Sequence, residues 1–214
     1  MIVLGLTGSV GMGKSVAAKA LHRLGAALFD ADAEVHRLLG PGGDAVAAVA
    51  AAFPEAALNN APNDAIGVAI DRGALAARVF DDDAAIRRLE AILHPLVRQA
   101  QGAFLKAALA RRQKLAVLDI PLLFETGGDK RCDAVAVVTA PAFLQAQRVL
   151  RRRGMTAARL AAIRARQMPD REKQRRADFV IHTGLSRRYS LAQLNRMVSI
   201  LTSNHAEEEA PDYA

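Results

Sequence analysis

The sequence predicts an α/β fold: a parallel sheet of five strands, with a helical insertion and a helical lid. Three observations lead to this prediction. Short apolar runs alternate with helical patterns along the chain, as in domains with a parallel sheet. The first apolar run passes directly into a glycine-rich segment and then into a helical pattern. Finally, residues 31–114 contain no convincing strand, which is far too long a stretch for a simple crossover loop.

The five candidate strands are mostly continuous apolar runs, as expected for strands covered on both faces. They are Ile2–Thr7, Ala26–Asp30, Leu115–Pro121, Ala134–Thr139 and Phe179–His182. We assign them to a core of about residues 1–30, 115–140 and 177–203.

Residues 8–15 read G-S-V-G-M-G-K-S, a complete G-x-x-x-x-G-K-[ST] phosphate-binding loop. The loop lies between the first strand and a helix predicted at Lys14–Leu24, which ends at Gly25. In such a loop the backbone N–H groups converge on phosphate oxygens, and the helix N-terminus adds positive potential. We expect Lys14 to reach the β- and γ-phosphates and the Ser15 hydroxyl to ligate Mg²⁺. The alternative, an ordinary glycine-rich turn, is disfavoured by the flanking strand and helix, so the motif predicts binding of a nucleoside triphosphate.

The long segment after the second strand is predicted to be a helical insertion, residues about 31–114. Helical patterns occur near Asp32–Leu39, Asp44–Phe53, Asp71–Phe80, Asp82–Leu93 and Pro95–Arg112, and Pro54–Ile70 is predicted to be a loop or linker. Ligands of open α/β sheets bind outside the carboxyl ends of the strands. We therefore expect the insertion to shape the site of a second substrate.

Residues 141–176 are predicted to form two or three helices, interrupted at Gly154 and Pro169. The segment from residue 148 onward is rich in cations, namely Arg148, Arg151, Arg152, Arg153, Arg159, Arg164, Arg166, Arg171, Lys173, Arg175 and Arg176. Its place after the fourth strand favours a mobile lid over the phosphates. A solvated cationic helix face is the alternative for any one of these arginines.

Composition narrows the classes of protein further. A chain of 214 residues can bury one sizeable core, here residues 1–203, followed by an acidic tail at 204–214 that we expect to be disordered. No apolar run approaches the roughly 20 residues of a membrane span, so we expect no membrane partner. The single Cys132 excludes an internal disulfide framework, and with no basic leader pattern we expect the cytoplasm. The net charge of +7 is concentrated near the predicted lid without interleaved aromatic residues, so we expect no nucleic-acid partner.

Three carboxylates and a histidine are candidate site residues. Asp30 and Asp32 follow the second strand, where either could instead cap the next helix; otherwise Asp32 accepts the proton of an acceptor hydroxyl. Asp119 lies in the third strand, near its end at Pro121, where it could hold Mg²⁺ through water or serve as a hydrogen-bonded strand-end carboxylate. His94 precedes Pro95: either His94 faces the second substrate, or Pro95 only restricts the residue before it and breaks the helix.

A phosphate loop alone leaves GTPases, ATPases and small-molecule kinases as possibilities. The chain has no N-K-x-D segment for reading guanine, and it is short for an ATPase with effector domains. A kinase needs a second pocket, a base near the acceptor hydroxyl and cations around the transferring phosphoryl group. The insertion, the Asp30/Asp32 pair and the arginine-rich segment supply candidates for all three.

These residues resemble the dephospho-coenzyme A kinase family over about residues 2–185. The matching segments are residues 6–16, 29–32 (F-D-A-D), 71–75 with 79–80, 89–97 (L-E-A-I-L-H-P-L-V), 121–125 (P-L-L-F-E), 166–168 and 177–181. The phosphate loop is shared by many enzymes, whereas the order of D-A-D, L-x-x-x-x-H-P and P-L-L-F-E is far more specific.

The resemblance implies a P-loop kinase core, a helical acceptor-binding domain and a lid. It implies that ATP, with Mg²⁺, phosphorylates the ribose 3′-hydroxyl of dephospho-CoA, and that Asp32 is the catalytic base. The ATP phosphates would lie against Gly8, Gly11, Met12, Gly13, Lys14, Ser15 and Val16. Arg148 and Arg152, four residues apart on one helix face, would be the lid cations, and the acceptor side would be lined by Asp30, His94, Leu122 and Glu125.

The sequence departs from the family pattern at three places. Val16 replaces a common Thr, Met12 replaces a small residue, and residues 181–184 (I-H-T-G) replace an asparagine-containing turn near the adenine. Two other functions stay open: a kinase of another nucleoside or small acceptor, and a nucleotide-gated nucleic-acid-binding module. The sequence does not predict an oligomeric state.

Overall fold

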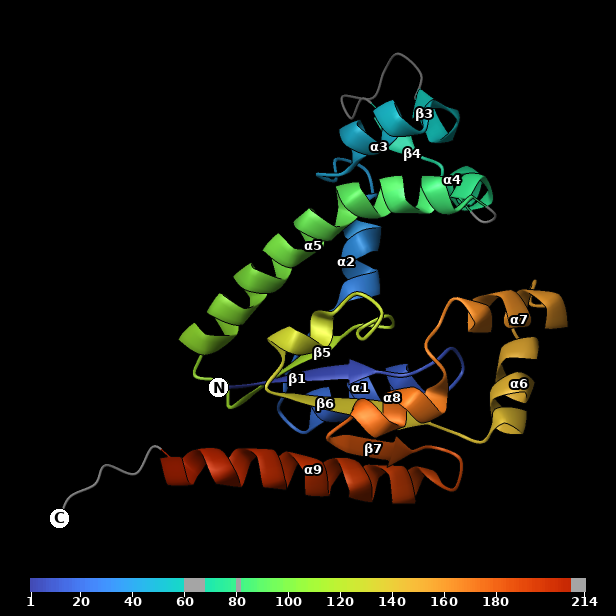
Figure 1. The fold of residues 1–214 in the computed structure, drawn as a ribbon. Coiled ribbons are helices and arrows are strands. Elements are labelled where there is room, and N and C mark those ends of the chain that lie inside the picture. The colour runs from blue at the N-terminus through green and yellow to red at the C-terminus, as the bar shows by residue number, and fades with distance from the viewer. Residues whose placement is uncertain (60–67, 80–81, 209–214) are drawn as a thin grey trace. The chain divides into compact units, whose positions relative to one another are not determined.

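The computed structural model describes residues 1–59, 68–79 and 82–208 (Figure 1). The chain divides into two compact units. One comprises Met1–Phe29 with Ala107–Ala214, and the other Asp30–Lys106. The predicted insertion, residues 31–114, includes all of the second unit except Asp30.

A five-stranded sheet forms the centre of the first unit. Its strands are β1 (Ile2–Thr7), β2 (Ala27–Asp30), β5 (Leu115–Asp119), β6 (Ala134–Thr139) and β7 (Phe179–His182), in the order β2-β5-β1-β6-β7. β1 pairs in parallel with β5 and β6, and β7 in parallel with β6, so the predicted α/β class and its five strands are confirmed. Because these strands are parallel, their carboxyl ends meet at one edge, where the segment after Thr7 begins.

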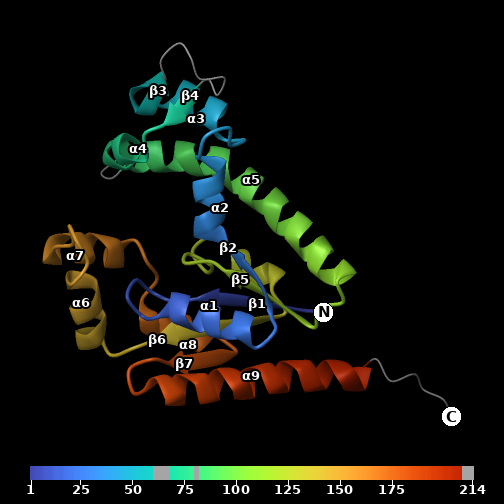
Figure 2. The ribbon, with the colours of Figure 1, turned by 180° about the vertical axis from the view of Figure 1, so that it is seen from behind.

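Two helices cover one face of this sheet, α1 (Lys14–Arg23) and α9 (Arg187–Glu208) (Figure 2). Leu4 and Leu6 of β1 pack there with Leu21 of α1 and Leu194 of α9, and all four side chains are fully or almost fully buried. On the opposite face a second cluster contains Leu123, Phe124, Val135 and Val137. The residues of β6 alternate between the two clusters, with Ala136 and Val138 in the first and Val135 and Val137 in the second, which explains why an uninterrupted apolar run is needed there.

Between β6 and β7 lie the three helices of the arginine-rich segment, by which we mean residues 141–176. They are α6 (Ala142–Leu150), α7 (Ala157–Ala165) and α8 (Asp170–Arg176). The predicted interruptions are confirmed. Gly154 has a φ of +75° between α6 and α7, and Pro169 occupies the N-cap of α8. One detail was wrong: α6 ends at Leu150, so Arg152 lies beyond the helix and not on the helix face of Arg148.

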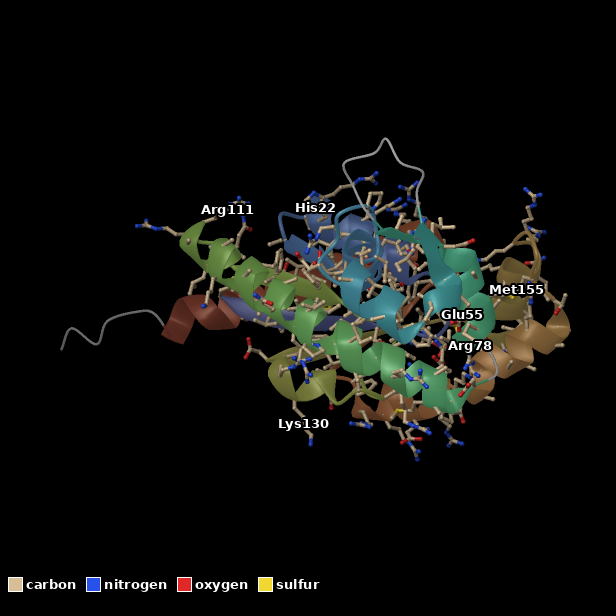
Figure 3. All side chains as sticks on the ribbon, turned by 90° about the horizontal axis from the view of Figure 1, so that it is seen from above. His22, Glu55, Arg78, Arg111, Lys130 and Met155 are labelled. Carbon is tan, nitrogen blue, oxygen red and sulfur yellow. The ribbon has the colours of Figure 1, made fainter. Side chains whose placement is uncertain are left out.

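The other unit contains α2 (Ala31–Leu38), α3 (Val46–Ala52), the 3-10 turn η1 (Pro54–Ala56), β3 (Ala57–Asn59), β4 (Val68–Ile70), α4 (Arg72–Val79) and most of α5 (Asp83–Ala110). Its core surrounds Phe53, which is 1% exposed. Figure 3 labels Arg78 and Glu55, whose side chains form an ion pair of 3.0 Å between α4 and η1.

Two predictions for this unit were wrong. The segment predicted as loop contains the antiparallel pair β3–β4, held by the register Ala57↔Ile70, although residues 60–67 themselves, with Pro62 and Gly67, lie outside the described residues. α5 also continues through Pro95 where two helices were predicted. Apolar side chains on both sides of the proline, such as Leu89, Leu93 and Val97, pack into one core, and this packing outweighs the single backbone hydrogen bond that proline removes.

The C-terminal helix α9 was not assigned from the sequence, and it continues to Glu208 although a disordered tail was predicted from residue 204. No glycine or proline occurs between Arg187 and Glu208, so nothing in the sequence stops the helix there. Residues 209–214 lie outside the described residues. Among the helices that the structure describes, none combines the length and apolar character that crossing a bilayer requires.

Candidate nucleotide-binding site

The phosphate loop joins β1 to α1 in a conformation that requires its glycines. Gly11 and Gly13 have φ angles of +77° and +96°, values that other residues rarely adopt. A Cβ on Gly8 would lie 2.6 Å from the carbonyl oxygen of Val138, so this glycine allows the loop to approach β6 closely. Gly13 caps α1 without any side-chain hydrogen bond to the helix. The first N–H groups of α1 therefore have no side-chain cap, which suits a bound anion.

Lys14 and Asp119 meet at the carboxyl edge of the sheet. The Lys14 Nζ lies 2.5 Å from Asp119 Oδ1, and the two side chains are 14% and 4% exposed. The predicted phosphate lysine and the predicted metal carboxylate thus lie together although they are far apart in sequence. The buried carboxylate holds the ammonium group in place at the base of the loop.

The other loop residues divide into buried and accessible positions. Ser15 and Val16 are exposed in the first turn of α1. Met12 is 3% exposed, and its Sδ accepts a hydrogen bond of 3.1 Å from the Ala140 backbone N–H. The Met12 side chain therefore anchors the loop to the end of β6, and only its backbone is available to a ligand.

Side chains of the arginine-rich segment contact the loop directly. Gln145 Nε2 donates to the Val10 carbonyl at 2.8 Å, and the Val10 N–H donates to Gln167 Oε1 at 3.2 Å. Arg148 donates to the Gly11 carbonyl at 3.4 Å and to the Thr183 hydroxyl and carbonyl at 3.2 and 2.8 Å. The sequence analysis missed the two glutamines. The available signal was the spacing of Gln145 and Arg148, which places both on one face of α6.

The predicted acceptor residue Glu125 is engaged within the first unit. Its carboxylate pairs with Lys173 Nζ at 2.8 Å and accepts from the Met168 N–H at 2.8 Å. Lys173 is completely buried and also lies 3.4 Å from the Pro121 carbonyl. Leu122 is half-buried beside this network. Glu125 therefore ties the turn after β5 to α8, a contact that the sequence analysis did not anticipate.

The remaining candidates belong to the unit Asp30–Lys106. The Asp30 carboxylate accepts a hydrogen bond of 3.0 Å from the Ala33 N–H, so Asp30 is the N-cap of α2. Asp32 lies in the first turn of α2 and is exposed. His94 is half-buried in the middle of α5. Of the two aspartates, the structure therefore assigns the capping role to Asp30.

The oxygen donors near the loop fit a magnesium ion. Mg²⁺ takes hard oxygen ligands, and it commonly binds one or two protein groups while keeping several waters. The Ser15 hydroxyl and the Asp119 carboxylate are of this type, whereas the described residues contain no cluster of three or more histidine, cysteine or acidic side chains. This donor set suits an ion shared with a nucleotide and not a cation held by protein alone.

A parallel sheet that carries such a loop, with a lysine and a carboxylate at its edge, defines a P-loop protein that binds a nucleoside triphosphate. The family model for dephospho-CoA kinase matches residues 2–186. A dephospho-CoA kinase of Rhodospirillum rubrum is 55% identical over 202 residues, covering 94% of this chain and 92% of that protein. The chain belongs to the dephospho-CoA kinase family, so the predicted family and activity are confirmed: it is a kinase that uses ATP.

Solved structures agree with this assignment. The crystal structure of TT1252 from Thermus thermophilus has a TM-score of 0.78 at 32% identity, covering 93% of this chain and 96% of that one. A dephospho-CoA kinase from Campylobacter jejuni has a TM-score of 0.66 at 25% identity, with 95% and 98% covered.

Proposed function

We propose that this chain transfers the γ-phosphoryl group of ATP to the ribose 3′-hydroxyl of dephospho-CoA in the cytoplasm, with Asp32 as base and Mg²⁺ at Ser15 and Asp119. The 3′-oxygen forms a bond to the γ-phosphorus, the bond from that phosphorus to the β–γ bridging oxygen breaks, and ADP leaves. The hydroxyl proton passes to the Asp32 carboxylate. The observation that carries the proposal is the Lys14–Asp119 pair at the base of a complete phosphate loop.

The loop binds the triphosphate through its backbone. The N–H groups at the start of α1, which have no side-chain cap, face the phosphate oxygens, and Lys14 exchanges its contact with Asp119 for the β- and γ-phosphates. Its buried partner keeps the ammonium group at the base of the loop. Little reorganisation is then required when ATP binds.

When bound, Mg²⁺ would neutralise charge on the β- and γ-phosphate oxygens. The Ser15 hydroxyl would be a direct ligand, and Asp119, released by Lys14, would hold a metal-bound water. Ser15 lies at the start of α1 and Asp119 at the end of β5.

Two cations of the arginine-rich segment, Arg148 and Arg152, stabilise the negative charge of the transferring group. Asp30 and His94 of one unit, and Leu122 and Glu125 of the other, are the residues that we propose for binding the acceptor. Arg148 donates hydrogen bonds to the Gly11 and Thr183 carbonyls, so its guanidinium lies against the loop. We expect Arg148→Ala to lower turnover about 10²-fold, because loss of one such charge-stabilising group commonly costs a few kcal/mol of barrier.

The test is ADP release from ATP, measured with and without dephospho-CoA. We expect dephospho-CoA to stimulate ADP release strongly and adenosine, shikimate or gluconate to stimulate it weakly. For the Lys14→Ala enzyme we expect no stimulation by any acceptor. Mass spectrometry of the product should place the new phosphate on the 3′-oxygen. Equal stimulation by an unrelated acceptor, or phosphate found elsewhere on the product, would contradict the proposal.

A further inference from the structure

Three successive carbonyl groups of the phosphate loop are each held by a side chain from outside the loop. Gln145 Nε2 donates to Val10 at 2.8 Å, Arg148 Nη1 donates to Gly11 at 3.4 Å, and Thr183 Oγ1 donates to Met12 at 2.6 Å. The first two donors come from α6 and the third from the turn after β7. A loop whose N–H groups face an anion must direct its carbonyls outward, so it needs donors on its outer side.

Thr183 is the most connected of the three donors. Its N–H donates to the Thr139 carbonyl at 2.8 Å, which fixes it to the end of β6. Its hydroxyl accepts from Arg148 Nη1 at 3.2 Å, and its carbonyl accepts from Arg148 Nη2 at 2.8 Å. Because the arginine is the donor in its contact with the Thr183 hydroxyl, the hydroxyl proton is free to form a hydrogen bond with a carbonyl oxygen. The Met12 carbonyl, at 2.6 Å, is nearer to the hydroxyl than the Thr139 carbonyl, at 3.2 Å.

The Met12 carbonyl and the Gly13 N–H belong to one peptide plane. In a trans peptide these two groups point in opposite directions, so a donor that holds the carbonyl outward also turns the N–H inward. Gly13 has a φ of +96°, and a Cβ there would lie 3.1 Å from Thr183 Oγ1, so the threonine lies directly against this peptide. Glycine can rotate freely, and the peptide would lose its fixed orientation without that contact.

We propose that Thr183 is a positioning residue of the nucleotide site: its hydroxyl holds the Met12–Gly13 peptide so that the Gly13 N–H faces the phosphates of ATP. The inference rests on the proposed phosphate site at this loop. It assigns Thr183 to the phosphates through the loop backbone, in the turn at 181–184 where the sequence departs from the family's asparagine-containing pattern.

The test compares Thr183→Val, which keeps the shape and removes the hydroxyl, with Thr183→Ser, which keeps the hydroxyl. Binding of ATP and of adenosine is measured by calorimetry without acceptor, and the KM for ATP and for dephospho-CoA by steady-state kinetics. Circular dichroism checks folding, and Thr183→Ala is the second hydroxyl-free variant if the valine variant does not fold. Because nucleotide binding is measured without acceptor, a wrong assignment of the acceptor does not affect this result.

We expect Thr183→Val to weaken ATP binding about tenfold, since a carbonyl is left without its donor. Adenosine binding and the KM for dephospho-CoA should stay within about twofold of wild type, and Thr183→Ser should restore ATP binding. Equal weakening of ATP and adenosine would overturn the proposal in favour of an adenine contact. Unchanged ATP binding in Thr183→Val, or a serine variant as weak as the valine one, would overturn it as well.

Discussion

Asp30 and Asp32 are two residues apart in sequence and differ in what they contact. Asp30 accepts from the Ala33 N–H and so stabilises the start of α2, whereas Asp32 is exposed in the first turn and has no hydrogen bond or ion pair with another described side chain. From sequence alone either residue could have been the cap, because both precede a helical pattern. An aspartate whose carboxylate is not occupied by a cap is available to accept a proton, and this supports Asp32 as the base.

Replacing Asp32 by Asn should lower turnover about 10²-fold or more while leaving the fold intact, because the amide cannot accept the hydroxyl proton. The measurement is steady-state ADP release at saturating ATP and dephospho-CoA. The matched control is Asp83→Asn, another exposed aspartate in the first turn of a helix, which should retain wild-type turnover. Wild-type-like turnover of Asp32→Asn would remove this residue from the mechanism.

The thiol of Cys132 gives a prediction for pH dependence. Burial raises the pKa of the Cys132 thiol to about 11, with nearby Arg131 opposing the shift. A folded-state pKa above the unfolded value stabilises the fold at neutral pH, and this contribution is lost as pH rises from about 9 through 11. Because the thiolate is the reactive form, iodoacetamide should modify the folded protein about 100-fold more slowly at pH 8 than the urea-unfolded protein. Equal rates in the two states would contradict the raised pKa, and Cys132→Ser provides the blank.

At the scale of elements, the sequence predicted the sheet well and the insertion less well. β5 and β6 are apolar runs in which every residue is buried, so composition alone indicates a strand there. The ends of β1, β6 and β7 match the prediction. β3 and β4 have three residues each and flank a segment rich in turn-forming residues. They are therefore too short to show the alternation of apolar and polar residues that indicates a strand. α5 was predicted as two helices because proline usually ends a helix. That rule considers only the local sequence and not the apolar packing on both sides of Pro95.

The candidate site was predictable only where a motif is continuous in sequence. The loop residues and Lys14 were identified from the pattern, and Asp119 from its place at a strand end. Gln167 and Thr183 contact the loop from distant segments, and single residues of ordinary type carry no sequence signal of such a contact; Gln145 could have been found only through its spacing with Arg148. Glu125 was identified, but its ion pair with Lys173 depends on how α8 packs against the turn after β5.

The ion pair between Lys173 and Glu125 should contribute to the stability of the fold by fixing α8 to the turn after β5. Lys173→Met should lower the free energy of unfolding by about 3 kcal/mol, because it leaves the Glu125 carboxylate partly buried without its cation. Urea unfolding followed by circular dichroism measures the change. The double variant Lys173→Met/Glu125→Gln should recover part of the loss, since the unpaired charge is then removed. A single variant within about 0.5 kcal/mol of wild type would show that the pair does not hold the helix.

At the scale of the whole molecule, the chain combines a sheet unit that carries the phosphate loop with a largely helical unit that carries Asp32. The catalytic residues that we propose are therefore divided between two compact units. The sheet unit contains every group proposed for ATP and Mg²⁺, namely the loop, Lys14, Ser15 and Asp119. Nucleotide binding should consequently be measurable without the acceptor and independently of Asp32.

Mg²⁺ and ATP together should stabilise the protein against heat. At a free ATP concentration of 100 times its dissociation constant the gain is about 2.7 kcal/mol, because only the folded state binds the nucleotide. The measurement is calorimetric unfolding of the full chain with ATP, in the presence of either Mg²⁺ or EDTA. Asp32→Asn should keep the whole gain, Lys14→Ala should lose most of it, and Ser15→Ala should lose only the part that depends on Mg²⁺. If Ser15→Ala responded to Mg²⁺ as fully as the wild type does, the Ser15 hydroxyl would not be a metal ligand, and the oxygen donors for Mg²⁺ would have to come from Asp119 and the phosphates alone.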